Sequence, residues 1–187
     1  MPDNPLHVYN HYSRRAASIV IREYSTSFSL ASCLLRGRVR HDICNLYAVV
    51  RIADEIVDGV AAAAGLDTNS IAAELDGFEQ QVFRATRTGF STNPAVHAFA
   101  STVHRCRISE EHIRAFFTSM RRDLDPTAYD QAALDDYIWG SAEVIGLMCL
   151  AIFTAEQPLS PTDQQRCEEG APPGSCVSEN QFPPRCG

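Results

Sequence analysis

A long and largely apolar helix is predicted over residues 39–58, and its second half, residues 46–58, reads LYAVVRIADEIVD. On a helical wheel, with about 100° between successive residues, aliphatic side chains cover most of the circumference, which is typical of a helix buried on nearly all sides. Four polar side chains form one narrow stripe, at spacings of four, three and four residues: Tyr47, Arg51, Asp54 and Asp58. We expect this stripe to face either the one solvated side of the helix or an internal cavity.

The two aspartates of the stripe are candidate metal ligands. Carboxylates at positions i and i+4 of a helix lie about 5–6 Å apart at their bases and repel one another when unpaired. A divalent cation would relieve the repulsion between Asp54 and Asp58, and oxygen ligands favour Mg²⁺. Arg51, one turn upstream, could bind an anion held by the same metal, because arginine and Mg²⁺ commonly act together on a diphosphate. The alternative is a solvated face on which Arg51 pairs with Asp54 and Glu55.

The rest of the chain has helical signals and almost no strand signal. Periodic apolar residues, N-cap residues and a proline at a first helical position predict five further helices: residues 4–22, 70–86, 94–107, 109–124 and 132–153. The helix at 39–58 is expected to stop at Gly59. Strict alternation of apolar and polar residues over four to eight positions is absent. The fold class is therefore predicted to be all-α.

Composition and charge set the outer limits on function. The chain has 187 residues, 45% of them hydrophobic, which suits one globular domain with a sizeable core. Its net charge of −7 and its lack of a basic run argue against a nucleic-acid partner. The longest apolar run, residues 144–153, is too short to span a bilayer, and residues 1–12 have no signal-peptide core, so we expect a cytoplasmic protein. The seven cysteines have no spacing typical of zinc ligands.

Three segments, in order along the chain, resemble the squalene/phytoene synthase family. They read YSTSF at residues 24–28, LYAVVRIADEIVD at 46–58, and SAEVIGLM at 141–148, the last preceded by Tyr137. The resemblance extends over roughly residues 8–158. The Asp-Glu-x-x-Asp form of the central motif and the Ser-Ala-Glu-Val-x-Gly-Leu-Met segment favour the phytoene synthase branch.

The resemblance implies a terpenoid-synthase-like helical fold around a deep apolar cavity. It also implies a prenyltransferase that joins two prenyl diphosphates head to head, converting geranylgeranyl diphosphate to phytoene through a cyclopropyl diphosphate intermediate. The squalene branch, which uses farnesyl diphosphate and ends in reduction by NADPH, or stops at dehydrosqualene, remains an alternative. A non-catalytic helical fragment is another. A chain-elongating prenyltransferase or terpene cyclase is a weaker reading, because those enzymes match the YSTSF and Tyr137 segments poorly.

The resemblance also assigns roles to individual residues. It implies that Asp54 and Asp58 bind Mg²⁺ and that Tyr137 lies near the reacting cation, whose charge an aromatic ring face can stabilise. It implies a substrate-binding group around the diphosphate: Tyr24, Ser25, Thr26, Ser27, Tyr47 and Arg51. Several other residues are expected to be structural, either as core or cavity wall or as acids in loops and at helix ends: Phe116, Phe117, Met120, Asp123, Asp125, Asp135 and Asp136. Glu143 departs from the family, in which many members have glycine, and an acid there requires an exposed position.

The larger departure from the family concerns its second aspartate motif, Gln-x-x-Asn-x-x-Arg-Asp, which residues 159–187 do not supply. We therefore expect residues 1–158 to be the N-terminal part of the domain, with C-terminal helices missing and with little or no activity.

Residues 159–187 begin with a helix start and then lose all periodicity. Back-translated from Ala171 and shifted by one nucleotide, they permit RRLGAAFQKINFLRD, which contains the motif. We hypothesise a frameshift after about Glu169, which sequencing of the coding DNA would test. The lipid product implies peripheral contact with a membrane.

Overall fold

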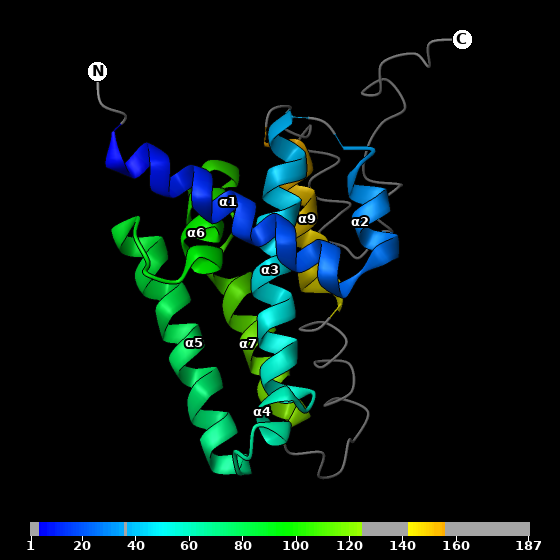
Figure 1. The fold of residues 1–187 in the computed structure, drawn as a ribbon, viewed down its shortest axis with the longest axis vertical. Helices are drawn as coiled ribbons and strands as arrows, with labels where there is room; N and C mark the ends of the chain where they lie inside the picture. Colours follow the sequence, from blue (N-terminus) through cyan, green and yellow to red (C-terminus); the bar gives the residue numbers. More distant parts are fainter. Residues whose placement is uncertain (1–3, 36, 125–141, 156–187) are drawn as a thin grey trace.

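The computed structural model describes residues 4–35, 37–124 and 142–155, and every secondary-structure element in these ranges is helical (Figure 1). The helices are α1 (Pro5–Tyr24), α2 (Thr26–Ser32), α3 (Gly37–Val57), α4 (Val60–Ala63), α5 (Thr68–Thr88), α6 (Pro94–Cys106), α7 (Glu110–Asp123) and α9 (Val144–Thr154). The predicted all-α class is confirmed. The predicted helices agree with the observed ones to within about two residues at each end, except that only the second half of the one predicted at 132–153 lies within the described residues.

Helix α3 is the centre of the arrangement. It contacts α1, α5, α6, α7 and α9, and α1 crosses over both α3 and α6 (Figure 1). Where α1, α3 and α6 meet, the buried residues are small: Ala17, Ala48, Ala95 and Ala98. Without bulky side chains between them, the three helix backbones can approach closely.

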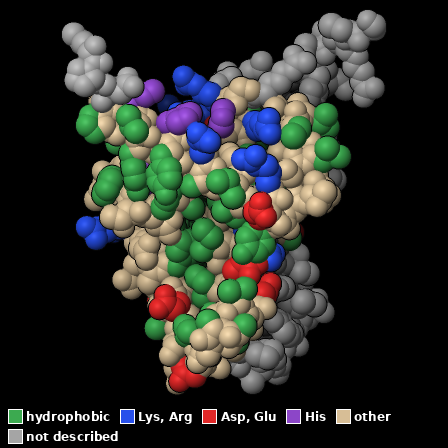
Figure 2. All heavy atoms as spheres, in the orientation of Figure 1, with side chains coloured by type: hydrophobic (Ala, Val, Ile, Leu, Met, Phe, Trp, Pro, Cys, Tyr) green, Lys and Arg blue, Asp and Glu red, His purple; other side chains and the backbone are tan. Residues whose placement is uncertain are grey.

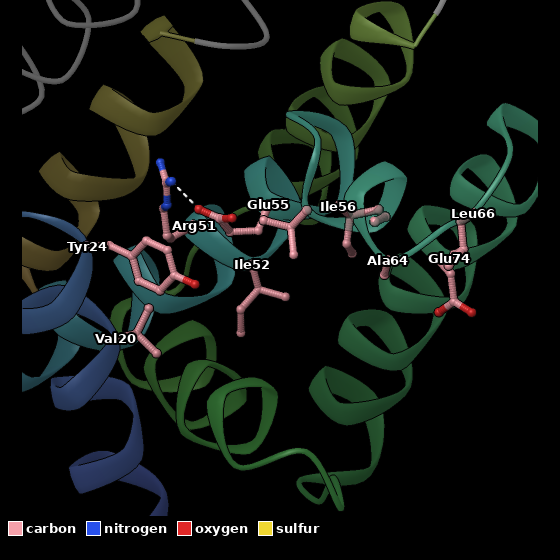
Figure 3. Close-up of a pocket in the computed structure, with 11 residues that line it drawn as sticks. Val20, Tyr24, Arg51, Ile52, Glu55, Ile56, Ala64, Leu66 and Glu74 are labelled. Carbon is pink, nitrogen blue, oxygen red and sulfur yellow. Dashed lines mark hydrogen bonds and ion pairs between the residues drawn. The ribbon is translucent and has the colours of Figure 1, made fainter.

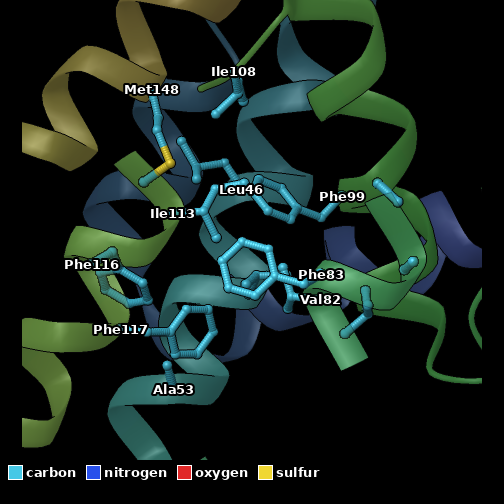
Figure 4. Packing of buried hydrophobic residues seen from close by; sticks show 14 of the residues in the cluster. Leu46, Ala53, Val82, Phe83, Phe99, Ile108, Ile113, Phe116, Phe117 and Met148 are labelled. Atoms are coloured by element: carbon cyan, nitrogen blue, oxygen red, sulfur yellow. The ribbon is translucent and has the colours of Figure 1, made fainter. Parts of the chain in front are cut away.

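The main core lies between α3, α5, α6, α7 and α9 (Figure 4). It is built from aliphatic and aromatic side chains that recur three or four positions apart on each helix, so that each helix buries one face. Phe116, Phe117 and Met120, expected as core or cavity wall, are at most 5% exposed and belong to this core.

Local capping explains most of the helix boundaries. Asn93 accepts hydrogen bonds from the backbone N–H groups of the first turn of α6, and Ser109 Oγ accepts one from Glu111 N–H at 3.1 Å at the start of α7. Gly89 closes α5 in the left-handed region at φ 72°, where glycine has no Cβ penalty.

Two short helices, α2 and α4, were not predicted. Helix α2 has seven residues and α4 has four, which is too short for an apolar period to register. Gly59 does end α3, as expected, but at φ 118° it turns the chain directly into α4.

None of the described helices is both long enough and apolar enough to cross a membrane.

Candidate functional site

The candidate site lies along the second half of α3. Tyr47, Arg51 and Asp54 are partly buried there, and Asp58 is exposed just past the last helical residue. The Asp58 N–H still donates to the Asp54 carbonyl oxygen at 2.7 Å, which keeps one helical turn between the two aspartates. The structure therefore brings together the stripe that the sequence predicted.

Arg51 is held by two neighbours. Its guanidinium forms an ion pair with Glu55 on the next turn of α3, and it lies over the Tyr24 ring at 4.7 Å from the ring centre (Figure 3). The Arg51–Glu55 pair is the one expected under the alternative of a solvated helix face. However, the two side chains are only 32% and 17% exposed, so this part of α3 is only partly open to solvent. The Arg51 Nε atom is buried without a hydrogen-bond partner among the described residues, which leaves a donor open for a further ligand.

The first turn of α2 supplies the other wall of the site. Phe28 stacks on Tyr47, with 5.3 Å between ring centres and 23° between ring planes. The Ser25 hydroxyl accepts a hydrogen bond from Phe28 N–H at 3.1 Å and so caps α2. Thr26 and Ser27 are exposed on the first turn. The first and last residues of the YSTSF segment thus lie beside the stripe, Tyr24 against Arg51 and Phe28 against Tyr47.

Asp54 is electrostatically the most perturbed residue of the site. Its pKa is raised from 3.8 to about 6, first by burial and next by the negative charge of Asp58, while the positive charge of Arg51 opposes the rise. A smaller contribution in the same direction comes from Asp123, the last residue of α7. Negative charge is therefore concentrated around Asp54 beyond what Arg51 neutralises.

Sequence reasoning missed the connection between Asp123 and Asp54. Asp123 does stand at a helix end, as expected, but the packing of α7 against α3 brings its charge close enough to act on Asp54. No helical spacing could have indicated this, because the two residues lie on different helices. The only signal was its placement at the C-terminal end of a helix, which is unfavourable for an acid.

A cleft of about 480 Å³ opens beside Arg51, between α1, α3, α4 and α5 (Figure 3). Tyr24, Arg51 and Glu55 line one part of it. Most of the remaining wall is aliphatic: Val20, Ile52, Ile56, Val60, Ala61, Ala64 and Leu66. The arrangement places an apolar surface next to a cation and a carboxylate, which suits an amphiphilic molecule.

The carboxylates of Asp54 and Asp58 suit Mg²⁺, but they supply only some of the ligands that the ion needs. Carboxylate oxygens are the hard ligands that Mg²⁺ prefers, and the raised pKa of Asp54 records negative charge that a cation would neutralise. Yet within the described ranges no three or more His, Cys, Asp or Glu side chains are grouped so as to hold a metal ion. Asp54 and Asp58 would therefore need water, substrate oxygens or ligands from other residues to complete the coordination.

The sequence singled out Tyr137 and Glu143 in and just before the SAEVIGLM segment, and only Glu143 lies within the described residues. Tyr137 lies outside the described residues, so its place near a reacting cation stays a prediction. Glu143 is exposed at the N-terminal end of α9. This position explains how an acid is tolerated there.

The raised pKa of Asp54 predicts a stability effect. The folded state holds the Asp54 proton up to about pH 6, whereas the unfolded chain releases it near pH 4, so this contribution to stability is full below about pH 4 and is lost as pH rises through 6. Asp54→Asn should therefore raise the free energy of unfolding of the metal-free chain by about 1 kcal/mol at pH 8, less than the full shift because the group is half exposed. At pH 5, between the two pKa values, the gain should be about half as large. Urea unfolding at pH 5 and pH 8 measures both, and equal gains at the two values would contradict the assignment.

Comparisons with known proteins agree on one family. Residues 21–171 match the model of the family described as squalene/phytoene synthase. The chain is 30% identical over 144 residues to a phytoene synthase of Arthrospira platensis, covering 75% of this chain and 44% of that protein. It is 25% identical over 154 residues to a 15-cis-phytoene synthase of Paracoccus sp., covering 80% and 49%. The chain thus spans about half the length of these curated relatives.

A solved structure supports the same fold. The crystal structure of a squalene synthase from Alicyclobacillus acidocaldarius superposes with a TM-score of 0.71 at 25% sequence identity. The match covers 86% of this chain and 57% of that one.

Proposed function

Because the chain belongs to the squalene/phytoene synthase family, we propose that it acts in the head-to-head condensation of two prenyl diphosphates. The expected product is phytoene, formed from geranylgeranyl diphosphate, since the two curated relatives described above are phytoene synthases. The observation that carries the proposal is the group of negative charges around Asp54, one helical turn from a partly buried arginine.

Asp54 and Asp58 would hold Mg²⁺, which when bound supplies positive charge to the leaving diphosphate. Their own contribution is to concentrate negative charge at one end of α3. Asp54 is partly buried, and Asp58, Asp123 and Glu55 place further negative charge around it, so its carboxyl is hard to ionise unless a cation is bound.

Arg51 would bind the diphosphate directly. Its planar guanidinium can donate two parallel hydrogen bonds to phosphate oxygens, and its buried Nε has a donor to offer. The Tyr24 ring under the guanidinium holds its orientation. The exposed Ser27 hydroxyl on the first turn of α2 is a further donor, and Tyr47, fixed by its stack on Phe28, completes this wall.

In the proposed reaction the first substrate loses its diphosphate and leaves an allylic cation. The double bond of the second substrate attacks that cation, and loss of a proton closes a cyclopropane ring that carries the remaining diphosphate. That diphosphate leaves in turn, the skeleton rearranges, and loss of a second proton gives phytoene. The protein's task is to exclude water from these cations, and the ring face of Tyr137 would stabilise their charge. The apolar product implies release at a membrane surface.

The substrate assignment is tested by the product profile. A chain in which the hypothesised frameshift after about Glu169 is reversed (the frame-restored chain) would be incubated with Mg²⁺ and either geranylgeranyl or farnesyl diphosphate, with and without NADPH. Phytoene from geranylgeranyl diphosphate supports the proposal. Squalene or dehydrosqualene from farnesyl diphosphate would favour the alternative suggested by the solved squalene synthase. If the folded, frame-restored chain forms no product from either substrate, the proposed function is wrong.

The substitution Arg51→Lys tests whether Arg51 binds the diphosphate or only forms an ion pair with Glu55. We expect kcat/KM to fall about tenfold or more, because lysine keeps the charge but loses the planar fork. Arg87→Lys is the matched control, since Arg87 pairs with Glu110 on the surface and is 68% exposed. Its kcat/KM should stay unchanged. If Arg51→Lys leaves kcat/KM unaltered, Arg51 serves only to pair with Glu55.

A further inference from the structure

A second charged pocket lies at the opposite end of α3 from Asp54. It has a volume of about 300 Å³ and lies where α1, α3 and α6 meet. Its lining includes three arginines, Arg14 from α1, Arg38 from α3 and Arg105 from α6, together with His41 and Asp42 from α3 and Ser101 from α6. Figure 2 shows arginine and histidine side chains gathered near the upper end of the molecule, with most acidic side chains lower on this face.

The one carboxylate in this pocket already has partners. Asp42 is buried, accepts a hydrogen bond from the Thr102 hydroxyl at 2.6 Å, and forms an ion pair with Arg105. Thr102 in turn accepts a hydrogen bond from the buried Asn45 amide at 3.1 Å. This network fixes Arg105 at the pocket wall. Asp42 therefore offsets the charge of Arg105 and does little for the other cations.

Arg14 and Arg38 are the cations left over, and the His41 ring lines the same pocket. None of the three takes part in an ion pair with the described residues. Two separate helices hold them around one pocket, although like charges repel. In a chain of net charge −7, where acids outnumber bases, such a grouping calls for an anionic ligand.

The pocket is distinct from the candidate site described above. Sixteen residues separate Arg38 from Asp54 on the continuous helix α3, which is about 24 Å at 1.5 Å per residue. A diphosphate bound near Asp54 would not reach Arg38, so an anion at this pocket would be a separate group.

We propose that this pocket binds a phosphate group. Guanidinium groups are the side chains best matched to phosphate oxygens. A tetrahedral dianion has oxygens pointing in several directions and can meet donors from three helices at once, whereas a planar carboxylate is satisfied by one guanidinium. The Ser101 hydroxyl and the His41 ring are further donors on the same wall. The phosphate could belong to free phosphate or diphosphate, or to a lipid headgroup, and the experiment distinguishes these sources.

The test uses the 187-residue chain and three single variants. Arg14→Gln and Arg38→Gln remove cations that line the pocket, and Arg15→Gln removes a neighbouring exposed arginine that does not line it. Titration calorimetry and ³¹P NMR would measure binding of inorganic phosphate and diphosphate without Mg²⁺. Co-sedimentation would use phosphatidylcholine vesicles with and without phosphatidylglycerol. All three positions are exposed, and far-UV circular dichroism of each variant confirms that the helices are retained.

We expect Arg14→Gln and Arg38→Gln each to weaken binding about tenfold, and Arg15→Gln to change it less than twofold. This pattern with the free anions supports a soluble ligand, and the same pattern only with phosphatidylglycerol vesicles supports a lipid headgroup. The absence of binding in both assays would overturn the proposal. So would an equal loss in all three variants, because it would show a diffuse surface charge instead of a pocket.

Discussion

Replacing Asp54 or Asp58 by alanine is expected to lower turnover by about a hundredfold or more in the frame-restored chain. Each substitution removes one of two carboxylates that would hold Mg²⁺, and the remaining one binds the ion weakly. Steady-state product formation from geranylgeranyl diphosphate at saturating Mg²⁺ measures the effect. Near-normal turnover in both variants would return the pair to a structural role.

Glu111→Ala is a suitable control for this loss. Glu111 is an exposed acid in the first turn of α7, so the variant has the same change in charge at a distance from α3. Its turnover should equal that of the parent chain. Circular dichroism separates loss of catalysis from loss of fold in all three variants.

The largest expected effect on stability is that of Phe117→Ala. The Phe117 side chain is 0% exposed and makes edge-to-face contacts with Phe78 and Phe116, with ring centres 6.0 and 5.3 Å away. Removing the ring leaves a cavity, and such substitutions cost about 3–5 kcal/mol. That is a large part of the roughly 5–15 kcal/mol that stabilises a typical domain.

Urea unfolding of the parent chain and of Phe153→Ala provides the comparison. Phe153 is on α9 and is 49% exposed, so its removal should cost less than about 1 kcal/mol. Similar losses for the two variants would mean that the region around Phe117 is not packed as the structure shows.

The sequence predicted the fold well wherever one helix buries one face. The apolar residues of α5 recur at spacings of four, three and four, and Ile71, Leu75, Phe78 and Val82 are all buried. Pro94 at a first helical position and Ser109 as an N-cap placed two helix starts correctly, because both act through residues next to them in the chain.

The sequence did not predict features that depend on contacts between helices. Asp123 acts on Asp54 only because α7 packs against α3. Arg14 and Arg38 line one pocket only because α1 crosses α3. In each case the residues are far apart in the chain, and their meeting is set by packing angles that no local period records.

The stripe on α3 could be predicted because its residues share one helix face. The Arg51–Glu55 pair lay among the alternatives for the same reason. What the pattern could not indicate was burial: a charged stripe looks the same in sequence whether water or protein faces it. The exposed fractions of these two side chains and the raised pKa of Asp54 supply that distinction.

Helix α3 carries its charges against its own macrodipole. The N-terminal end of a helix is partly positive and the C-terminal end partly negative, yet the first turn of α3 has arginines and no acid, and the last turn has Asp54 and Glu55 and no base. Side chains and backbone therefore create a positive potential at one end and a negative potential at the other. A phosphate at the N-terminal end would reduce the excess positive charge there, and a divalent cation at the C-terminal end would reduce the excess negative charge. Each ion should therefore raise the melting temperature of the chain independently of the other.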